Sequence, residues 1–392
     1  MLLHKFIHDK MTERMNGMKS KKICGMVSLV MIFSFLGGVN IDLDCQAQRC
    51  VNYETEAEIN RAISSLEETI ASERNEMLEE VVEEIAVSAQ WNEELDSTEK
   101  KKIEGIKRGI AKTNDVNKRA EVVVKTLEDI EEYKNVAVLL KDEIEVSSLS
   151  DFENQPLINQ QTGKEIGTVK EAKRYFEELG YEVDNSTYVM CREIEKTKKR
   201  NKNVSTVELV EDINSALTKK SAESTNIISF GIVAQASKKY QVTYAEWSAL
   251  TTEEKVLIVT DPKKAVGTKA VTEKAYSMTK KKFGYNGLGD KSDGFRHAVW
   301  NALMARDIGK SWAKSYATAH ESGKTKAELN KKAHDGYKEK YHRKMDLHNN
   351  KIGRSVIKWY DTGLNVSDKE LQKRVSKKLT NNKKTGIYWL HK

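Results

Sequence analysis

The chain is 392 residues long, which allows two or three domains. Its hydrophobic content of 39% permits a packed core, while a charged content of 32% and only two prolines favour long, solvated helices. The sequence contains no internal repeat and no CxxC pair, which excludes a repeat architecture and a metal site built on paired cysteines.

Charge is distributed unevenly along the chain. Residues 261–392 hold 31 Lys and Arg against 13 Asp and Glu, a net charge of +18, and because the whole chain carries +7, the first 260 residues carry −11. Halves of opposite charge attract each other, or the basic half faces an anionic partner such as nucleic acid, anionic lipid or a wall polymer. A basic surface that serves only solubility explains the same composition.

Residues 1–47 are typical of a secretory signal or a membrane anchor. Lys19, Lys21 and Lys22 precede the uncharged apolar run ICGMVSLVMIFSFLGGV. Cleavage after Ala47 would release the rest of the chain outside the cytoplasm. An uncleaved anchor is the alternative, although a span takes about twenty apolar residues and this run is short for one. We therefore expect a secreted or surface-attached bacterial protein.

Cysteine usage follows from this expectation. Cys24 and Cys45 lie within the leader, so Cys50 and Cys191 are the two that would remain after export. An oxidising compartment would allow them to form a disulfide. Their distance in the sequence leaves the pairing open.

Residues 48–146 are predicted to form an acidic helical stalk. Apolar residues recur at steps of three and four between Glu54 and Val87, as in an amphipathic helix of the coiled-coil kind. A second helical pattern covers Thr98 to Lys141. Such a stalk either binds a partner protein or acts as a spacer.

Residues 147–235 are predicted to be a linker followed by a small mixed region. The stretch 147–163 is polar and contains a proline, which is typical of a connection. A short helix then ends at Gly180, a strand is expected at 181–184, and the run 227–234 is apolar and β-prone.

Residues 236–392 are predicted to form a compact, basic helical domain. Thr251 and Glu254 have capping-box spacing, and the proline after Asp261 should end the helix that they begin. Further helices are expected over 264–283, 294–308, 311–322 and 337–360, with Ser292 or Asp293 as the N-cap of the second. The fold class is therefore mainly α: a signal or anchor, an elongated helical middle and a compact C-terminal helical domain.

Polar side chains concentrate in this domain, where five of the eight histidines lie between residues 290 and 354. They occupy three predicted helices, whose alanines would allow close packing. Asp293, His297 and Asn301 are four residues apart and share one helix face. The candidates in all are Asp293, Arg296, His297, Asn301, His320, Glu321, Asp346, Asn349, Asn350 and Arg354.

Three interpretations of this cluster stay open. In the first, His297, His320 and Asp346 bind zinc or another divalent metal, and Asp293 or Glu321 acts as a base towards a bound water. In the second, a histidine oriented by a carboxylate abstracts a proton without a metal. In the third, the same groups form a structural network that links the helices.

Three phrases carry a resemblance: DGFRHAVWNALMARDIG, then AHE, then MDLHNNKIGR. With the upstream WSALTTEEKVLIVTDP they resemble a bacterial domain family of unknown function, over about 120 residues from Trp247 to Trp359. The family occurs at the C-terminus of secreted and wall-associated proteins, some of them toxin-like. The resemblance implies a compact helical domain. It also implies that His348 is no ligand, because relatives carry an aromatic residue there.

These observations favour an exported protein whose C-terminal domain is a hydrolase, metal-assisted in the first interpretation, that acts on an anionic substrate. Arg296, with His297, Asp293 and Glu321, belongs to the catalytic set. The binding set comprises Asn301, Asn349, Asn350 and Arg354. The alternatives are a non-catalytic surface module that binds an anionic polymer or a protein, and a toxin-like nuclease domain.

Overall fold

The structure is a computed structural model that describes residues 54–392, apart from 94, 135–136, 138–139, 142–145, 147, 202, 230–242 and 359–360. The predicted leader and Cys50 therefore lie outside the described residues, as does most of the β-prone run at 227–234. Cys191 is a free, buried thiol.

The described residues are helical, and no strand is formed among them, so the prediction of a mainly α fold is confirmed. No helix of this part of the chain is both long enough and apolar enough to cross a bilayer. In chain order the elements are α3 Glu56–Trp91, α4 Ser97–Ile110, α5 Val116–Glu128, η2 Glu131–Tyr133, α7 Leu149–Asn154, α8 Val169–Glu178, α9 Asn185–Arg200, α10 Thr206–Ser229, α12 Thr252–Thr260, α13 Pro262–Phe283, α14 Lys291–Asp307, α15 Lys310–His320, α16 Lys326–Leu329, α17 Glu339–Ser355 and α18 Asp368–Lys377.

Side-chain caps explain where the main helices begin. The predicted capping box at the start of α12 is present: the Thr251 side chain accepts from the Glu254 backbone, and the Glu254 carboxylate accepts from the Thr251 N–H at 2.8 Å. The same arrangement starts α3 at Thr55 and α8 at Thr168. Each box satisfies backbone donors that a helix start would otherwise leave unpaired.

Three predicted boundaries are wrong. The helix expected from 98 to 141 is interrupted because Asp115 caps a new helix, α5. The strand expected at 181–184 is a loop, in which Tyr181 packs into the core and Asp184 caps α9. The last predicted helix, 337–360, ends at Ser355 as α17.

Helix α3 belongs to two hydrophobic clusters. Its first half places Ile59, Leu66 and Ile70 in the cluster that also contains the core of α12 to α18. Its second half, with Leu78 and Ile85, packs with α4 and α5 in a separate cluster. The predicted stalk is thus helical, but half of its first helix is core for the C-terminal helices.

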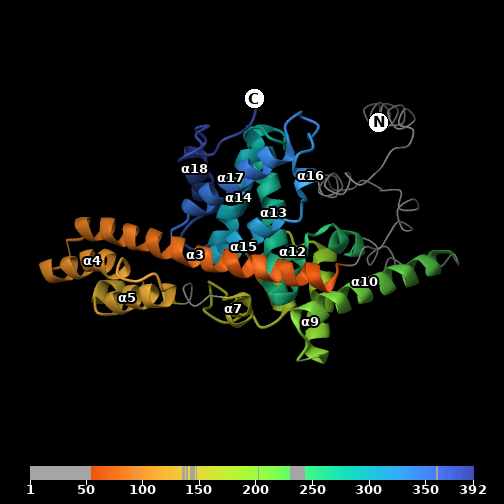
Figure 1. Cartoon of the computed structure of the whole chain (residues 1–392), viewed down its shortest axis with the longest axis horizontal. Helices are drawn as coiled ribbons and strands as arrows, with labels where there is room; N and C mark the ends of the chain where they lie inside the picture. Colours follow the sequence, from red (N-terminus) through yellow and green to blue (C-terminus); the bar gives the residue numbers. More distant parts are fainter. Residues whose placement is uncertain are drawn as a thin grey trace. The chain divides into compact units, whose positions relative to one another are not determined.

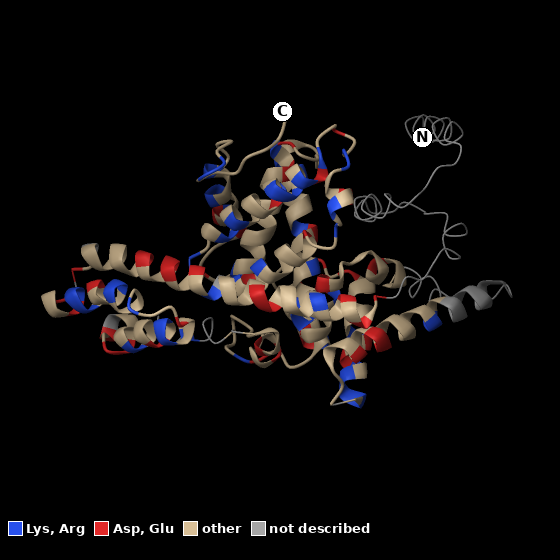
Figure 2. Ribbon diagram, in the orientation of Figure 1, with Lys and Arg blue, Asp and Glu red and all other residues tan. Residues whose placement is uncertain are grey.

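Opposite charges accompany this packing. Glu76 of α3 lies 3.5 Å from Lys314 of α15 and 3.5 Å from Lys351 of α17. Figure 2 marks the Asp and Glu residues of α3 and the Lys and Arg residues of the C-terminal helices. Exposed pairs of this kind contribute little each, so the apolar contacts hold α3 in place and the charges favour its orientation.

Helix α14 is the central element of the C-terminal part, where it packs against α13, α15, α17 and α18 (Figure 1). Its closest neighbour is α17, because Gly353 has no side chain to separate the two backbones: a Cβ atom there would overlap the Ala298 carbonyl. This approach fixes which residues of α14 and α17 face each other.

We predict that Gly353→Ala lowers the free energy of unfolding by about 1–3 kcal/mol, because the added methyl must push α17 away from α14. Urea denaturation of both proteins measures the difference. Gly105→Ala in α4 is the matched control, since a Cβ at Gly105 meets nothing within 4 Å. The control should be neutral or stabilising, by up to about 1 kcal/mol. Equal stability of Gly353→Ala and the wild type would contradict the close packing.

Candidate metal centre

The first turn of α14 holds Asp293 in a fixed orientation. The N-cap is Asp290 rather than the predicted Ser292 or Asp293, because Asp290 Oδ1 accepts from the Ser292 and Asp293 backbones at 2.8 and 3.0 Å. Gly289, in the left-handed region at φ 71°, donates its N–H to Asp293 Oδ2 at 2.6 Å. Arg296 donates to the other oxygen, Oδ1. Both oxygens of this buried carboxylate are therefore oriented.

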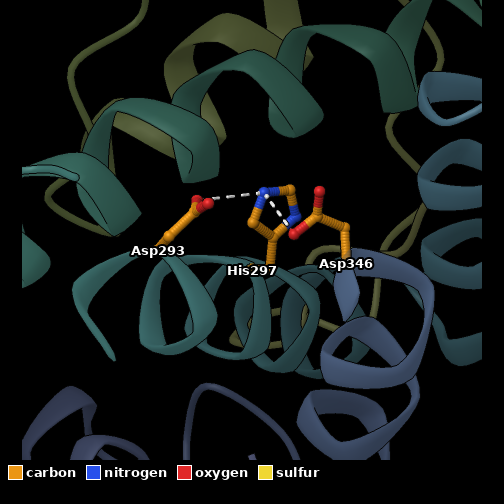
Figure 3. Close-up of side chains that lie close together, drawn as sticks. All are labelled: Asp293, His297 and Asp346. Carbon is orange, nitrogen blue, oxygen red and sulfur yellow. Dashed lines mark ion pairs between the residues drawn. The ribbon is translucent and has the colours of Figure 1, made fainter. Parts of the chain in front are cut away.

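His297 lies between two carboxylates from two helices. Its Nε2 is 3.5 Å from Asp293 Oδ1, one turn earlier on α14, and 3.4 Å from Asp346 Oδ1 on α17. Figure 3 shows the imidazole between the two acids. Asp293 is 1% exposed and Asp346 7%, and the His297 side chain is 11% exposed. This is the one group of three such side chains, among the described residues, whose ligand atoms all lie within 4.8 Å of one another.

The two distances at His297 Nε2 match the ligand spacing around a small divalent ion. Nitrogen and oxygen ligands lie about 2.0–2.2 Å from zinc, so the edges of a tetrahedral site are roughly 3.3–3.6 Å long. The two separations at His297 Nε2, 3.5 and 3.4 Å, are edges of that length. Three protein ligands leave a fourth position for water or substrate, as in catalytic zinc sites. The group could therefore hold a metal.

The electrostatics of the centre favour a cation. Burial, together with the charges of Glu321 and Asp293, raises the pKa of Asp346 well above its usual value. Burial also raises the pKa of Glu321. Burial lowers the pKa of His297 to about 3, although Asp293 opposes the shift, so its imidazole is neutral at pH 7. Neutral imidazole beside crowded carboxylates is the donor set that binds a divalent metal.

Buried polar atoms without a hydrogen bond also gather here. Among the described residues they include His297 Nδ1 and Trp300 Nε1 on α14, and Arg343 Nε, Asp346 Oδ1 and Asn350 Nδ2 on α17. Folded proteins rarely leave buried polar groups unpaired, and such groups call for an ion or an ordered water. Their concentration on the two facing helices supports a ligand site between them.

His320, predicted as a metal ligand, has a different partner. It lies at the end of α15, and its Nδ1 is 2.9 Å from Glu254 Oε1 on α12. Its ring meets the edge of Trp300, with centroids 5.5 Å apart, and Trp300 also contacts His297, with centroids 6.3 Å apart. The structure thus groups Asp293, rather than His320, with His297 and Asp346. Glu321 follows His320 and is linked to Asp346 by charge.

The predicted binding residues form contacts between elements. Asn301 Nδ2 donates to Asn350 Oδ1 at 2.7 Å, and Arg354 donates to Asn301 Oδ1 at 2.7 Å, which joins α14 to α17 next to the triad. Asn349 donates to the Tyr388 carbonyl at 2.9 Å and accepts from the Tyr388 N–H at 3.1 Å. Asn349 therefore fixes the C-terminal tail against α17.

Sequence reasoning missed Glu254, Trp300 and Arg343. Glu254 was assigned to a capping box, which it does form, and its second role depends on tertiary packing. Nothing in the sequence pattern marked Trp300 as part of the site, because an apolar residue on a helix is expected in the core. Arg343 did carry a signal, because it precedes Asp346 by three residues and therefore shares its helix face.

The pair His320–Glu254 predicts a pH-dependent stability. Burial alone would lower the pKa of His320, but the charge and hydrogen bond of Glu254 outweigh it and raise the pKa to about 9. The ordinary value is about 6.5. Because the folded state binds the proton more tightly, the pair's contribution is complete below about pH 6.5 and is lost as the pH rises through 9.

A double-mutant cycle with His320→Gln and Glu254→Gln measures this contribution by urea unfolding. Glutamine at position 254 keeps an acceptor for the Thr251 N–H, so the capping box serves as the internal control. We expect a favourable coupling at pH 6 and a much smaller one at pH 10. A coupling that grows with pH would contradict the charged pair.

Comparison with known proteins adds one match. No curated protein and no solved structure matches the chain. Residues 255–383 match the model of a family described as a domain of unknown function (DUF6973), and this segment contains α13 to α18 and the triad Asp293, His297 and Asp346. The chain thus carries a C-terminal domain of the DUF6973 family, at residues 255–383.

Proposed function

We propose that the C-terminal domain is a metal-dependent hydrolase, with a divalent ion such as zinc held by Asp293, His297 and Asp346. The observation that carries the proposal is the position of His297 Nε2, 3.5 and 3.4 Å from two buried carboxylates. A divalent ion bound there would lower the pKa of a water molecule and polarise the bond to be cleaved.

The neighbouring residues have defined tasks in this proposal. Arg296 and the Gly289 N–H orient Asp293 towards His297. Glu321, at the end of α15, is the base that accepts a proton from the attacking water. Asn301 and Asn350 hold α14 and α17 together and so keep the two acids on opposite sides of His297.

The charge of the domain favours an anionic substrate. Residues 261–392 carry +18, and a positively charged surface raises the local concentration of an anionic polymer. Phosphodiesters and wall polymers are both of this kind. A non-catalytic module that binds such a polymer, or a protein partner through α3 to α5, would use the same charge without the metal.

Metal binding provides the first test. The metal-free full-length protein, titrated with Zn²⁺ or Mn²⁺ in a calorimeter, should bind one ion per chain. Asp346→Asn and His297→Gln should weaken the affinity at least tenfold, because each removes one of three ligands. His334→Gln is the matched control, since His334 is exposed and lies outside α14 and α17, the two helices that carry the ligands. Unaltered metal affinity in Asp346→Asn would rule out the site.

Hydrolysis of bis-p-nitrophenyl phosphate is the second readout. The wild type should cleave it only with the metal present, and Asp346→Asn and Glu321→Gln should reduce kcat at least a hundredfold. Metal binding in Glu321→Gln should persist, which separates the base from the ligands. Binding of anionic polymer that survives all of these substitutions, with no cleavage by the wild type, would favour the non-catalytic module.

We also propose that the protein is exported and attached to the cell surface or released. The support is the basic flank and apolar run between Lys19 and Val39. Protease added to intact bacteria that express the full chain should degrade it. A chain with three arginines inserted in the apolar run should stay protected, and protection of the wild-type chain would contradict export.

A further inference from the structure

The face of α17 that carries Asp346 continues one turn towards the start of the helix, to Arg343. Asp346 faces His297 and Asn350 faces Asn301, so these contacts define the side of α17 that lies against α14. Arg343 lies three residues before Asp346 and seven before Asn350, which puts it on the same side of the helix. Arg343 therefore lies one helical turn from Asp346 on the face of α17 that packs against α14.

Arg343 differs from the other cations of this centre. Arg296 is paired with Asp293, His320 with Glu254, and Lys324 with Glu339 at 2.8 Å. For Arg343 the described residues provide neither a hydrogen bond nor an ion pair, although its Nε is buried. Its charge acts on Glu321, which is in turn linked to Asp346, so it lies within electrostatic range of the triad.

A buried guanidinium nitrogen without a hydrogen bond is unusual, because a buried polar group is costly unless a partner satisfies it. The planar fork of arginine donates two parallel hydrogen bonds and matches the oxygens of a phosphate group. The net charge of +18 over residues 261–392 also favours a phosphate-containing ligand, since a basic surface attracts polyanions. A bound phosphate ester supplies the acceptor oxygens that the Arg343 Nε lacks.

We propose that Arg343 forms an oxyanion subsite beside the triad and that the substrate class of the domain is phosphate esters. The inference rests on the proposed metal-dependent hydrolase, because it gives that site its substrate. Arg343 binds two phosphate oxygens, while the triad faces the phosphorus and the bond that is cleaved. Arg343 is then a substrate-binding residue and takes no part in holding the metal.

Calorimetry on the full-length protein separates these roles, with inorganic phosphate as the probe. The zinc-loaded wild type should bind phosphate, and Arg343→Gln should weaken that binding at least tenfold, the usual effect of losing a charge-assisted hydrogen bond. Its metal affinity should stay within about twofold. Arg343→Lys, which keeps the charge but not the fork, should be intermediate.

Lys344→Gln is the matched control, because it removes the same charge from an exposed position of the same helix. It should leave phosphate affinity within about twofold, and circular dichroism should show that each variant is folded. Acetate as a second probe should bind at least tenfold more weakly than phosphate.

Equal phosphate affinity of Arg343→Gln and the wild type would overturn the subsite, and equal affinity for acetate would overturn the substrate class. If the wild type binds no metal, the proposed metal-dependent hydrolase is refuted, while the Arg343 subsite is still open to test. Phosphate binding that depends on Arg343 in the metal-free protein would then still support the subsite, and its absence would refute it.

Discussion

The backbone contact between Gly353 and Ala298 is the constraint on which the candidate centre depends. Because α14 and α17 approach this closely, Asp346 of one helix reaches His297 of the other at 3.4 Å. A larger residue at Gly353 would push the helices apart by about an ångström, which is enough to separate Asp346 from His297. The asparagine pair Asn301–Asn350, at 2.7 Å, keeps the same two helices in register.

The centre is also costly for the fold. The charge of Asp293 helps to raise the pKa of both Asp346 and Glu321, because like charges in a buried site repel. Only Asp293 has a close arginine partner, Arg296. Carboxyl groups whose pKa values are raised by burial and by neighbouring acids cluster at functional sites, which is why this group is the candidate.

Local patterns in the sequence predicted the helices and part of the site. Periodicity and caps were sufficient for α3, α12 and α13, and the spacing of four residues placed Asp293 and His297 on one face. We also expected His297 and Asp346 to lie close together. Their relative position along α14 and α17 depends on Gly353, and the effect of this glycine appears only when the two helices are packed together.

Other features left no local signal. Helix α18 was not predicted because Leu371 and Val375 are its only buried apolar residues in a highly charged segment. His320 looked like a ligand because its acceptor, Glu254, comes from a helix more than sixty residues away in the sequence. Which acid meets which histidine is decided by tertiary packing, and a single sequence does not encode it in any short pattern.

The shared position of α3 has a consequence for the limits of the folding unit. The segment that matches the family model is 255–383, yet its core continues outside these limits: Ile59 and Leu66 of α3 and Ile387 of the tail belong to the same apolar cluster. Residues 255–383 expressed alone would therefore expose apolar side chains that α3 and the tail cover in the full chain.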